Sequence, residues 1–328
     1  MTRLNYIDRL KGFAILLVVM GHLYLFPMHP NDTFIYRVIQ SFHMPLFLFL
    51  SGYVIFTPPN LTNVKNKSKK YLLPMFVFGA LFSLYIQQTY TWDDLSGSFK
   101  FLFAESKNGY WYFLSLTMFY LTLSFLNLHT KRQKLTEIGF AILFYIVFYI
   151  GWRKGGLIGE VLSLEHAACF YPFYVLGYLS RKYNLVNELL EKNWIFTMAL
   201  VGYIILINLE DTNIPHSIYS VMTRYAMPTM AIIMSLFIFV KREKENSFIE
   251  NQLAFLGKNT LSIYVLHFFI VYKINLEVFC SLFNDNSNTF TQLILVTIIS
   301  IIVAYCSVYI GIFIKASNAI RKYIYCEK

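Results

Sequence analysis

Ten apolar segments, each close to the length needed to cross the hydrocarbon of a bilayer, constrain the fold of this chain more than any other feature. Only 14% of the residues are charged, against about 25% in an average soluble domain. Inside a bilayer, a helix satisfies every backbone polar group within its own segment. The sequence therefore predicts an all-α polytopic membrane protein embedded in the lipid bilayer. The expected spans are residues 10–27, 34–56, 71–89, 110–128, 136–152, 166–180, 194–209, 218–240, 253–273 and 290–314.

The distribution of charge predicts how these spans are oriented. Most of the 28 lysines and arginines fall in every second connection, and the connections between them carry mainly acidic residues. Because cytoplasmic loops are enriched in Lys and Arg, the alternation predicts ten transmembrane helices with both the N- and C-termini cytoplasmic. The net charge of +10 then reflects topology, and no nucleic-acid partner is expected. We expect a single transmembrane domain over residues 1–328, without a fused soluble domain, in a cytoplasmic (inner) membrane.

Two ionisable residues, Lys11 and His22, lie within the first span. Their spacing corresponds to about three helical turns, or ~16.5 Å of rise, so they share one helix face. An ionisable residue inside a membrane helix indicates a functional site, and histidine is the side chain best suited to moving protons near neutral pH. Asp8 precedes Lys11 by one turn and can orient it. The alternatives are that Lys11 is a basic anchor at the membrane surface and that His22 only hydrogen-bonds a neighbouring helix.

Four lysines precede the third span, and two of them, Lys67 and Lys70, share a helix face. A basic cluster at this place is what the predicted topology requires. It also suits phosphate groups that arrive from the cytoplasm. The two interpretations are compatible. The candidate phosphate-binding set consists of Lys67 and Lys70 together with Lys11.

A second histidine, His43, precedes Pro45 in the second span. Pro45 removes a backbone hydrogen bond and is expected to bend the helix. With Ser41 beside it, His43 would then line a polar notch. His43 is either a rival to His22 as general base or a residue that supports it.

Polar and aromatic residues on the outer half of the predicted bundle form a candidate acceptor site. Aromatic rings offer flat faces to the C–H surface of a sugar, and polar groups pair with its hydroxyls. For the aromatic members the alternative is a belt at the membrane interface. The cysteines form no metal-ligand spacing, so no metal is expected. The candidate residues are Tyr110, Trp111, Glu165, Arg224 and His267, where Glu165 either accepts a proton or pairs with Arg224.

Taken together, these residues resemble the acyltransferase-3 family of integral membrane acyltransferases. The resemblance begins with the basic-x10-His pattern of Lys11 and His22 and includes the lysine pair before the third span. It continues in FHMPLF at residues 42–47, SGY at 51–53 and LGKNTLSIYVLH at 256–267. It covers the whole chain and is strongest to the compact members that acetylate sugars of surface polysaccharides.

The resemblance implies a membrane O-acetyltransferase. His22 matches the family's catalytic histidine, and the lysines at positions 11, 67 and 70 match basic positions that hold CoA. The family commonly has arginine at these positions, and lysine cannot form the same bidentate contact. The implied reaction moves an acetyl group from cytosolic acetyl-CoA to a sugar hydroxyl of a surface polysaccharide or its lipid-linked precursor. The alternative from another class is a polytopic transporter or exporter of glycan or lipid precursors, which fits ten spans and buried charges equally well.

Overall fold

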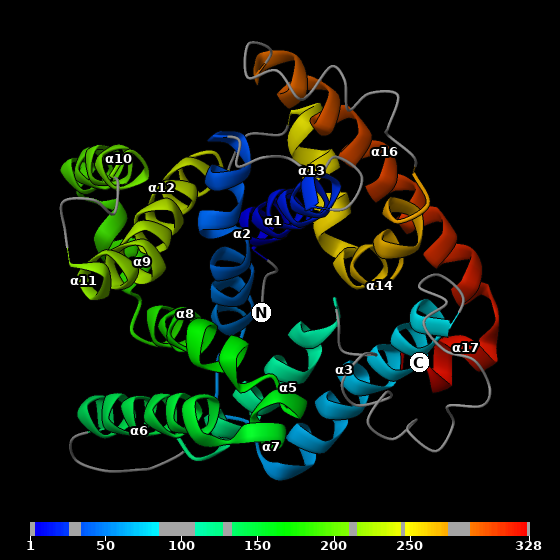
Figure 1. Cartoon of the computed structure of the whole chain (residues 1–328), viewed down its shortest axis with the longest axis horizontal. Coiled ribbons are helices and arrows are strands. Elements are labelled where there is room, and N and C mark those ends of the chain that lie inside the picture. Colours follow the sequence, from blue (N-terminus) through cyan, green and yellow to red (C-terminus); the bar gives the residue numbers. More distant parts are fainter. Residues whose placement is uncertain are drawn as a thin grey trace. The chain divides into compact units, whose positions relative to one another are not determined.

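The computed structural model describes residues 4–25, 34–84, 109–126, 133–209, 215–243, 247–274 and 289–326 (Figure 1). Every regular element within these ranges is a helix, which confirms the all-α prediction for this part of the chain. The chain divides into two compact units, and each is described by itself. Unit 1 comprises Met1–Val54 and Leu176–Tyr309, and unit 2 comprises Ile55–Val175 and Ile310–Lys328.

Unit 1 is built around α1 (Asn5–Leu25), the helix that carries Lys11 and His22. The other helices that lie wholly in this unit are α2 (Phe34–Tyr53), α9 (Leu185–Leu190), α10 (Asn193–Ile207), α11 (His216–Val221), the π-helix η4 (Met222–Ala226), α12 (Met227–Lys241), α13 (Phe248–Lys258) and α14 (Thr260–Val271). α1 packs against α2, α12, α13 and α14, and Figure 1 shows it, in dark blue, beside the yellow α13. A helix covered from several sides is buried along most of its length, so its polar residues must find partners inside the protein.

α1 and α13 approach each other closely at two glycines. A methyl group on Gly12 would overlap the backbone carbonyl of Leu253, and one on Gly257 would overlap the backbone carbonyl of Asp8. Small residues let the backbones of membrane helices pack this closely. The contact therefore fixes the position of α1, and with it the positions of its ionisable side chains.

A second packing centre of unit 1 joins α10, α12 and α2. Tyr203 of α10 is buried against Met227 and Ala231 of α12. Its hydroxyl lies 2.8 Å from the hydroxyl of Ser41 on α2, which also donates a hydrogen bond to the Val38 carbonyl. The Ser41 hydroxyl, which the sequence placed beside His43, is therefore hydrogen-bonded to Tyr203 of α10.

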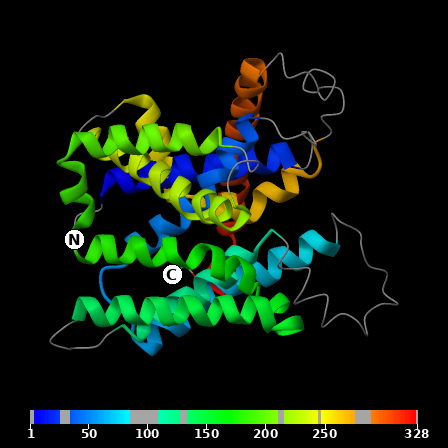
Figure 2. The same ribbon diagram turned by 60° about the vertical axis from the view of Figure 1, so that its left-hand side comes forward.

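Unit 2 has an aromatic core. The helices that lie wholly in it are α3 (Leu61–Phe82), α5 (Trp111–Ser124), α6 (Gln133–Lys154), α7 (Gly156–Val161) and α17 (Asn318–Tyr323), while α8 (Leu164–Lys182) and α16 (Thr289–Ala316) belong in part to each unit. Phe119 of α5 packs on Tyr171 and Tyr174 of α8, with both ring centroids 5.2 Å away. Phe148 of α6 lies 5.1 Å from Tyr171, and Figure 2 shows α6 running alongside α8. Aromatic pairs of this kind stabilise a core beyond the area that they bury.

Within the described residues, each of the ten predicted spans overlaps one or more helices, but fewer of them meet the length and composition of a membrane span. Four helical stretches among the described residues do so, namely Phe34–Tyr53, Gln133–Lys154, His216–Lys241 and Phe290–Ala316. α1 falls outside this set because its first turns carry Asp8, Arg9 and Lys11. The protein is thus helical with several apolar helices suited to a membrane, and ten spans with cytoplasmic termini remain a prediction.

Two of the predicted spans differ in shape from the helices observed. The segment predicted at residues 253–273 is divided into α13 and α14, which are bent by 84° at a short break near Asn259. α3 begins ten residues before the third predicted span, after the N-cap Asn60, whose side chain accepts a hydrogen bond from the Asn63 amide. Lys67 and Lys70 therefore lie on a helix that extends beyond the predicted membrane boundary.

Candidate active site

Three histidines from three helices of unit 1 lie close together: His22 on α1, His43 on α2 and His267 on α14. The ring centroids of His22 and His267 are 5.2 Å apart. Phe268 packs on both rings, at 4.5 Å from His22 and 4.3 Å from His267. A β-carbon on Gly21, the residue before His22, would lie 3.9 Å from Nε2 of His43. The structure therefore brings together the two histidines predicted as catalytic and the one predicted to bind the acceptor.

Backbone hydrogen bonds define which nitrogen carries the hydrogen in two of these rings. Nδ1 of His43 lies 2.9 Å from the Ile39 carbonyl oxygen, and Nδ1 of His267 lies 2.9 Å from the Ile263 carbonyl oxygen. A carbonyl oxygen can only accept, so each Nδ1 carries a hydrogen and donates it. In the neutral rings the lone pair then belongs to Nε2, which is available as a hydrogen-bond acceptor.

Accessibility separates His22 from the other two histidines. The residue as a whole is half-buried, although its Nδ1 is enclosed, whereas His43 and His267 are 6% and 0% exposed. A general base must come within hydrogen-bond distance of the proton that it removes. Of the three imidazoles, His22 is therefore best placed to meet a substrate, and the enclosed rings are better placed to support it.

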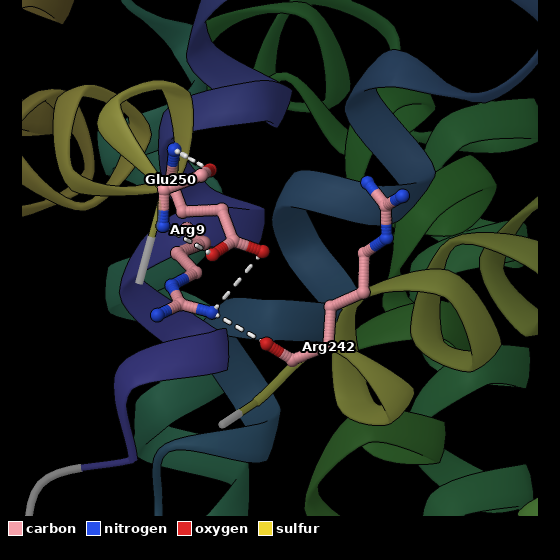
Figure 3. Close-up of polar contacts among 4 residues, drawn as sticks. Arg9, Arg242 and Glu250 are labelled. Atoms are coloured by element: carbon pink, nitrogen blue, oxygen red, sulfur yellow. Dashed lines mark hydrogen bonds and ion pairs between the residues drawn. The ribbon is translucent and has the colours of Figure 1, made fainter. Parts of the chain in front are cut away.

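A buried ion pair holds the N-terminal end of α1 (Figure 3). Nη1 of Arg9 lies 3.5 Å from Oε1 of Glu250 on α13 and donates a 2.8 Å hydrogen bond to the Arg242 carbonyl oxygen at the end of α12. Glu250 also closes a capping box with Ser247 at the start of α13. The paired side chains are 5% and 8% exposed, and breaking a pair this buried is strongly destabilising. The cluster ties α1, α12 and α13 together two residues from Lys11.

Lys11 and Asp8 lie one turn apart on α1, where Asp8 is buried and Lys11 is half-buried. α1 is continuous from Asn5 to Leu25, so Lys11 and His22 share one face as the sequence predicts. A further cation lies in unit 1: the guanidinium of Arg181 stands 5.4 Å from the Tyr53 ring centroid. The Tyr53 hydroxyl lies 3.1 Å from that of Tyr6 near the start of α1.

The second part of the predicted phosphate-binding set lies in unit 2. Lys67 and Lys70 stand three residues apart on α3, the first exposed and the second half-buried. Nζ of Lys67 lies 5.6 Å from the centroid of Tyr71, which stacks on Phe113 of α5. Desolvation by the surrounding protein lowers the pKa of the Lys67 ammonium even though its side chain is exposed. Neutralisation by a bound phosphate would favour the charged form again.

An aromatic stack in unit 2 contains Trp111, the most accessible aromatic residue of the predicted acceptor set. The indole of Trp111 lies 4.2 Å from the ring of His166 and 5.2 Å from that of Phe170, both nearly parallel to it. His166 and Phe170 are themselves 6.4 Å apart. Rings on opposite faces of an indole would be about 7 Å or more apart, twice a van der Waals separation, so both lie against one face. Tyr110 is fully buried and packs on Phe82.

The two charged members of the predicted acceptor set are both exposed. Glu165 lies in the first turn of α8, in unit 2, and Arg224 lies in η4, in unit 1. π-helical turns such as η4 are frequent at functional sites. Because these residues belong to different units, the sequence alternatives for Glu165, proton acceptor or partner of Arg224, both remain predictions.

Sequence reasoning missed two features of these sites. It counted Arg9 among the topological charges, because nothing in the neighbouring residues distinguishes a buried arginine from an anchoring one. The S-F-I-E capping box at residues 247–250 was a readable sign of a helix start beside it. His166 was placed among the polar residues of the outer half, but its stack with Trp111 and Phe170 was not foreseen, although it precedes Phe170 by one helical turn and so shares a face with it. Among the described residues, no group of three or more His, Cys, Asp or Glu side chains could hold a metal ion.

Comparison with protein families identifies the class of this chain. A family model described as an acyltransferase domain matches residues 4–309. Nodulation protein NolL of Sinorhizobium fredii (strain NBRC 101917 / NGR234) is 36% identical over 83 residues, which cover 23% of this chain and 23% of NolL. The match thus spans less than a quarter of that relative's length. No solved structure matches the chain.

Proposed function

The chain belongs to the acyltransferase-3 family of membrane acyltransferases, and from this premise we propose that it is a membrane O-acetyltransferase. It would move an acetyl group from cytosolic acetyl-CoA to a sugar hydroxyl of a surface polysaccharide or its lipid-linked precursor. The observation that carries the proposal is the histidine cluster of unit 1, in which the half-buried His22 is backed by two enclosed imidazoles. A base within an apolar helix bundle is what removal of a hydroxyl proton requires.

His22 is the general base of the proposed reaction. It takes the proton of the acceptor hydroxyl as the oxygen attacks the thioester carbonyl, a role that typically contributes about 10²–10⁴-fold in rate. The variant in which His22 itself carries the acetyl group is nucleophilic catalysis by the same ring. His43, enclosed beside Gly21, supports His22 in this assignment.

The three lysines that the family resemblance assigns to CoA are the proposed contacts for the phosphates of acetyl-CoA. Lys11 stands on the helix of His22, and the rise between them suits an extended pantetheine arm. Lys67 and Lys70 share one face of α3. Asp8, one turn before Lys11, orients the lysine. A phosphate held by lysines is bound by charge rather than by a fixed fork, so each lysine is expected to contribute to affinity for acetyl-CoA and little to turnover.

Trp111 is the proposed contact for the acceptor sugar. His166 and Phe170 cover one face of its indole, and the C–H face of a sugar ring would stack on the other. Tyr110 is buried and packs on Phe82, so it contributes by packing. Glu165 and Arg224 complete this acceptor set, whereas His267, which the sequence also placed in it, lies beside His22.

A transporter or exporter of glycan or lipid precursors is the second candidate, because apolar helices with buried charges suit transport as well. Purified protein in lipid nanodiscs, given acetyl-CoA radiolabelled in its acetyl group and polysaccharide from the source cells, separates the two. The proposal predicts that label leaves acetyl-CoA and is recovered on the polysaccharide. Label that stays on CoA, while vesicles containing the protein move glycan, would identify a transporter.

A further inference from the structure

His267 is the most enclosed of the three histidines. It is 0% exposed, and its ring centroid lies 5.2 Å from His22, 4.3 Å from Phe268 and 5.9 Å from Tyr264. The sequence interpretation grouped it with the residues that bind the acceptor. Its observed neighbours are instead the proposed base and apolar or aromatic rings.

Within the described part of the chain, Nε2 of His267 is an acceptor without a donor. Nδ1 donates to the Ile263 carbonyl oxygen, so in the neutral ring the lone pair belongs to Nε2. This nitrogen is buried and has no hydrogen-bond partner among the described residues. Buried polar atoms are nearly always hydrogen-bonded, so an orphan of this kind calls for an explanation.

His22 is the best available donor to this nitrogen. Among the described residues, the titratable rings in contact with His267 are His22 from α1 and Tyr264 from α14 itself, and His43 from α2 lies near His22. Nδ1 of His43 already donates to the Ile39 carbonyl, and Tyr264 is the more distant ring. A centroid separation of 5.2 Å allows a nitrogen of His22 to come within about 3 Å of Nε2 when the rings turn towards each other.

We propose that His267 is a positioning residue for His22: its Nε2 accepts a hydrogen bond from one ring N–H of His22 and thereby turns the other, unprotonated nitrogen of His22 towards the reacting hydroxyl. The assignment rests on the proposed function, in which His22 is the base. It corresponds to the role of the carboxylate in a Ser-His-Asp triad. A neutral imidazole fulfils that role here without the cost of a charge inside an apolar helix bundle.

His22 both accepts and returns the proton that is transferred in this step. The hydroxyl proton passes to the unprotonated nitrogen of His22 as the new C–O bond forms. The C–S bond breaks, and His22 returns that proton to the departing thiolate. The hydrogen shared with His267 stays in place throughout, so His267 keeps its own protonation state and acts only by holding the ring.

Two substitutions at position 267 separate positioning from packing. His267→Phe keeps an aromatic ring and removes the acceptor, whereas His267→Gln keeps a carbonyl oxygen near the place of Nε2. We expect His267→Phe to lower kcat about 100-fold with a change in KM for acetyl-CoA below about three-fold. His267→Gln should recover about ten-fold of that loss, because one good hydrogen bond is restored. His216→Gln, at an exposed histidine of α11, is the matched control and should retain wild-type kinetics.

The assay is transfer of radiolabelled acetyl from acetyl-CoA to polysaccharide from the source cells, with each variant in nanodiscs. The inference is overturned if His267→Phe keeps wild-type kcat, or if His267→Phe and His267→Gln lower kcat equally. It is also overturned if His267→Phe changes only the KM for the acceptor. Should His267→Phe fail to fold, His267→Asn, whose shorter amide does not reach His22, replaces it; equal rates for Gln and Asn then overturn the inference. Wild-type protein that transfers no label, or an active His22→Ala variant, would instead contradict the proposed function.

Discussion

The two units place different chemistry on their helices. Unit 1 encloses imidazoles and an ion pair inside closely packed helices, with His22, His43 and His267 from three separate segments of the chain. Unit 2 packs aromatic rings in its core and presents Lys67 and Trp111 at accessible positions. Proton transfer needs groups held in fixed geometry, whereas binding of phosphates and sugars needs charge and flat apolar faces. In the proposed assignment, the catalytic His22 and Lys11 belong to unit 1, whereas Lys67, Lys70 and Trp111 are binding residues of unit 2.

The largest effect is expected from His22→Ala in unit 1. Removal of the general base should reduce acetyl transfer by about 10²–10⁴-fold and leave acetyl-CoA affinity close to that of the wild type. Radiolabelled transfer and equilibrium binding of acetyl-CoA measure the two quantities. Equal losses in transfer and in acetyl-CoA affinity would show that chemistry and binding are not separated between the units.

Gly257→Ala tests whether the geometry of unit 1 depends on the close contact of α1 and α13. The added methyl would overlap the Asp8 carbonyl, and overpacking of this kind costs about 1–3 kcal/mol. We expect a lower unfolding midpoint in detergent and reduced turnover. Gly139→Ala on α6 is the control, because nothing lies within 4 Å of its β-carbon position. If both variants melt like the wild type, the backbone contact does not fix α1.

Lys67→Ala should affect binding more than turnover. Loss of one phosphate contact is expected to raise KM for acetyl-CoA about ten-fold with kcat nearly unchanged. The pKa of Lys67 is lowered by desolvation, so the wild-type advantage over Lys67→Ala should shrink as pH rises and the ammonium loses its proton. Steady-state kinetics across a pH series, with Lys65→Ala on the same helix as control, measure this. A loss in kcat alone would move Lys67 out of the binding set.

Trp111→Ala should give the smallest effect, confined to the acceptor. Loss of one stacking face costs about 0.5–1.5 kcal/mol, which corresponds to a rise in acceptor KM of a few-fold with KM for acetyl-CoA unchanged. Trp152→Ala on α6, in the same unit, is the matched control. An unchanged acceptor KM in Trp111→Ala would support a membrane-interface role for this side chain.

The sequence predicted the helical class well, because each apolar segment is long enough to form a helix on its own. It also predicted that Lys11 and His22 share a face, because the two residues lie on one continuous helix. It did not predict the α13–α14 break at Asn259, because residues 253–273 together have the length of one span, although Gly257, Lys258 and Asn259 interrupt the apolar run there. The grouping of His267 with His22 was also out of reach, because tertiary packing brings α14 to α1 and no local period encodes that contact.

The central claim is that the thioester of acetyl-CoA reaches the imidazole of His22. An experimental structure with a non-hydrolysable acetyl-CoA analogue measures this as the distance from the carbon that replaces the thioester carbonyl to the nearest His22 nitrogen. The account predicts a separation that leaves room for only one reacting hydroxyl, with the phosphates at Lys11 and the α3 lysines. A His22 ring that faces lipid, or an analogue whose acyl end lies away from it, would contradict the account.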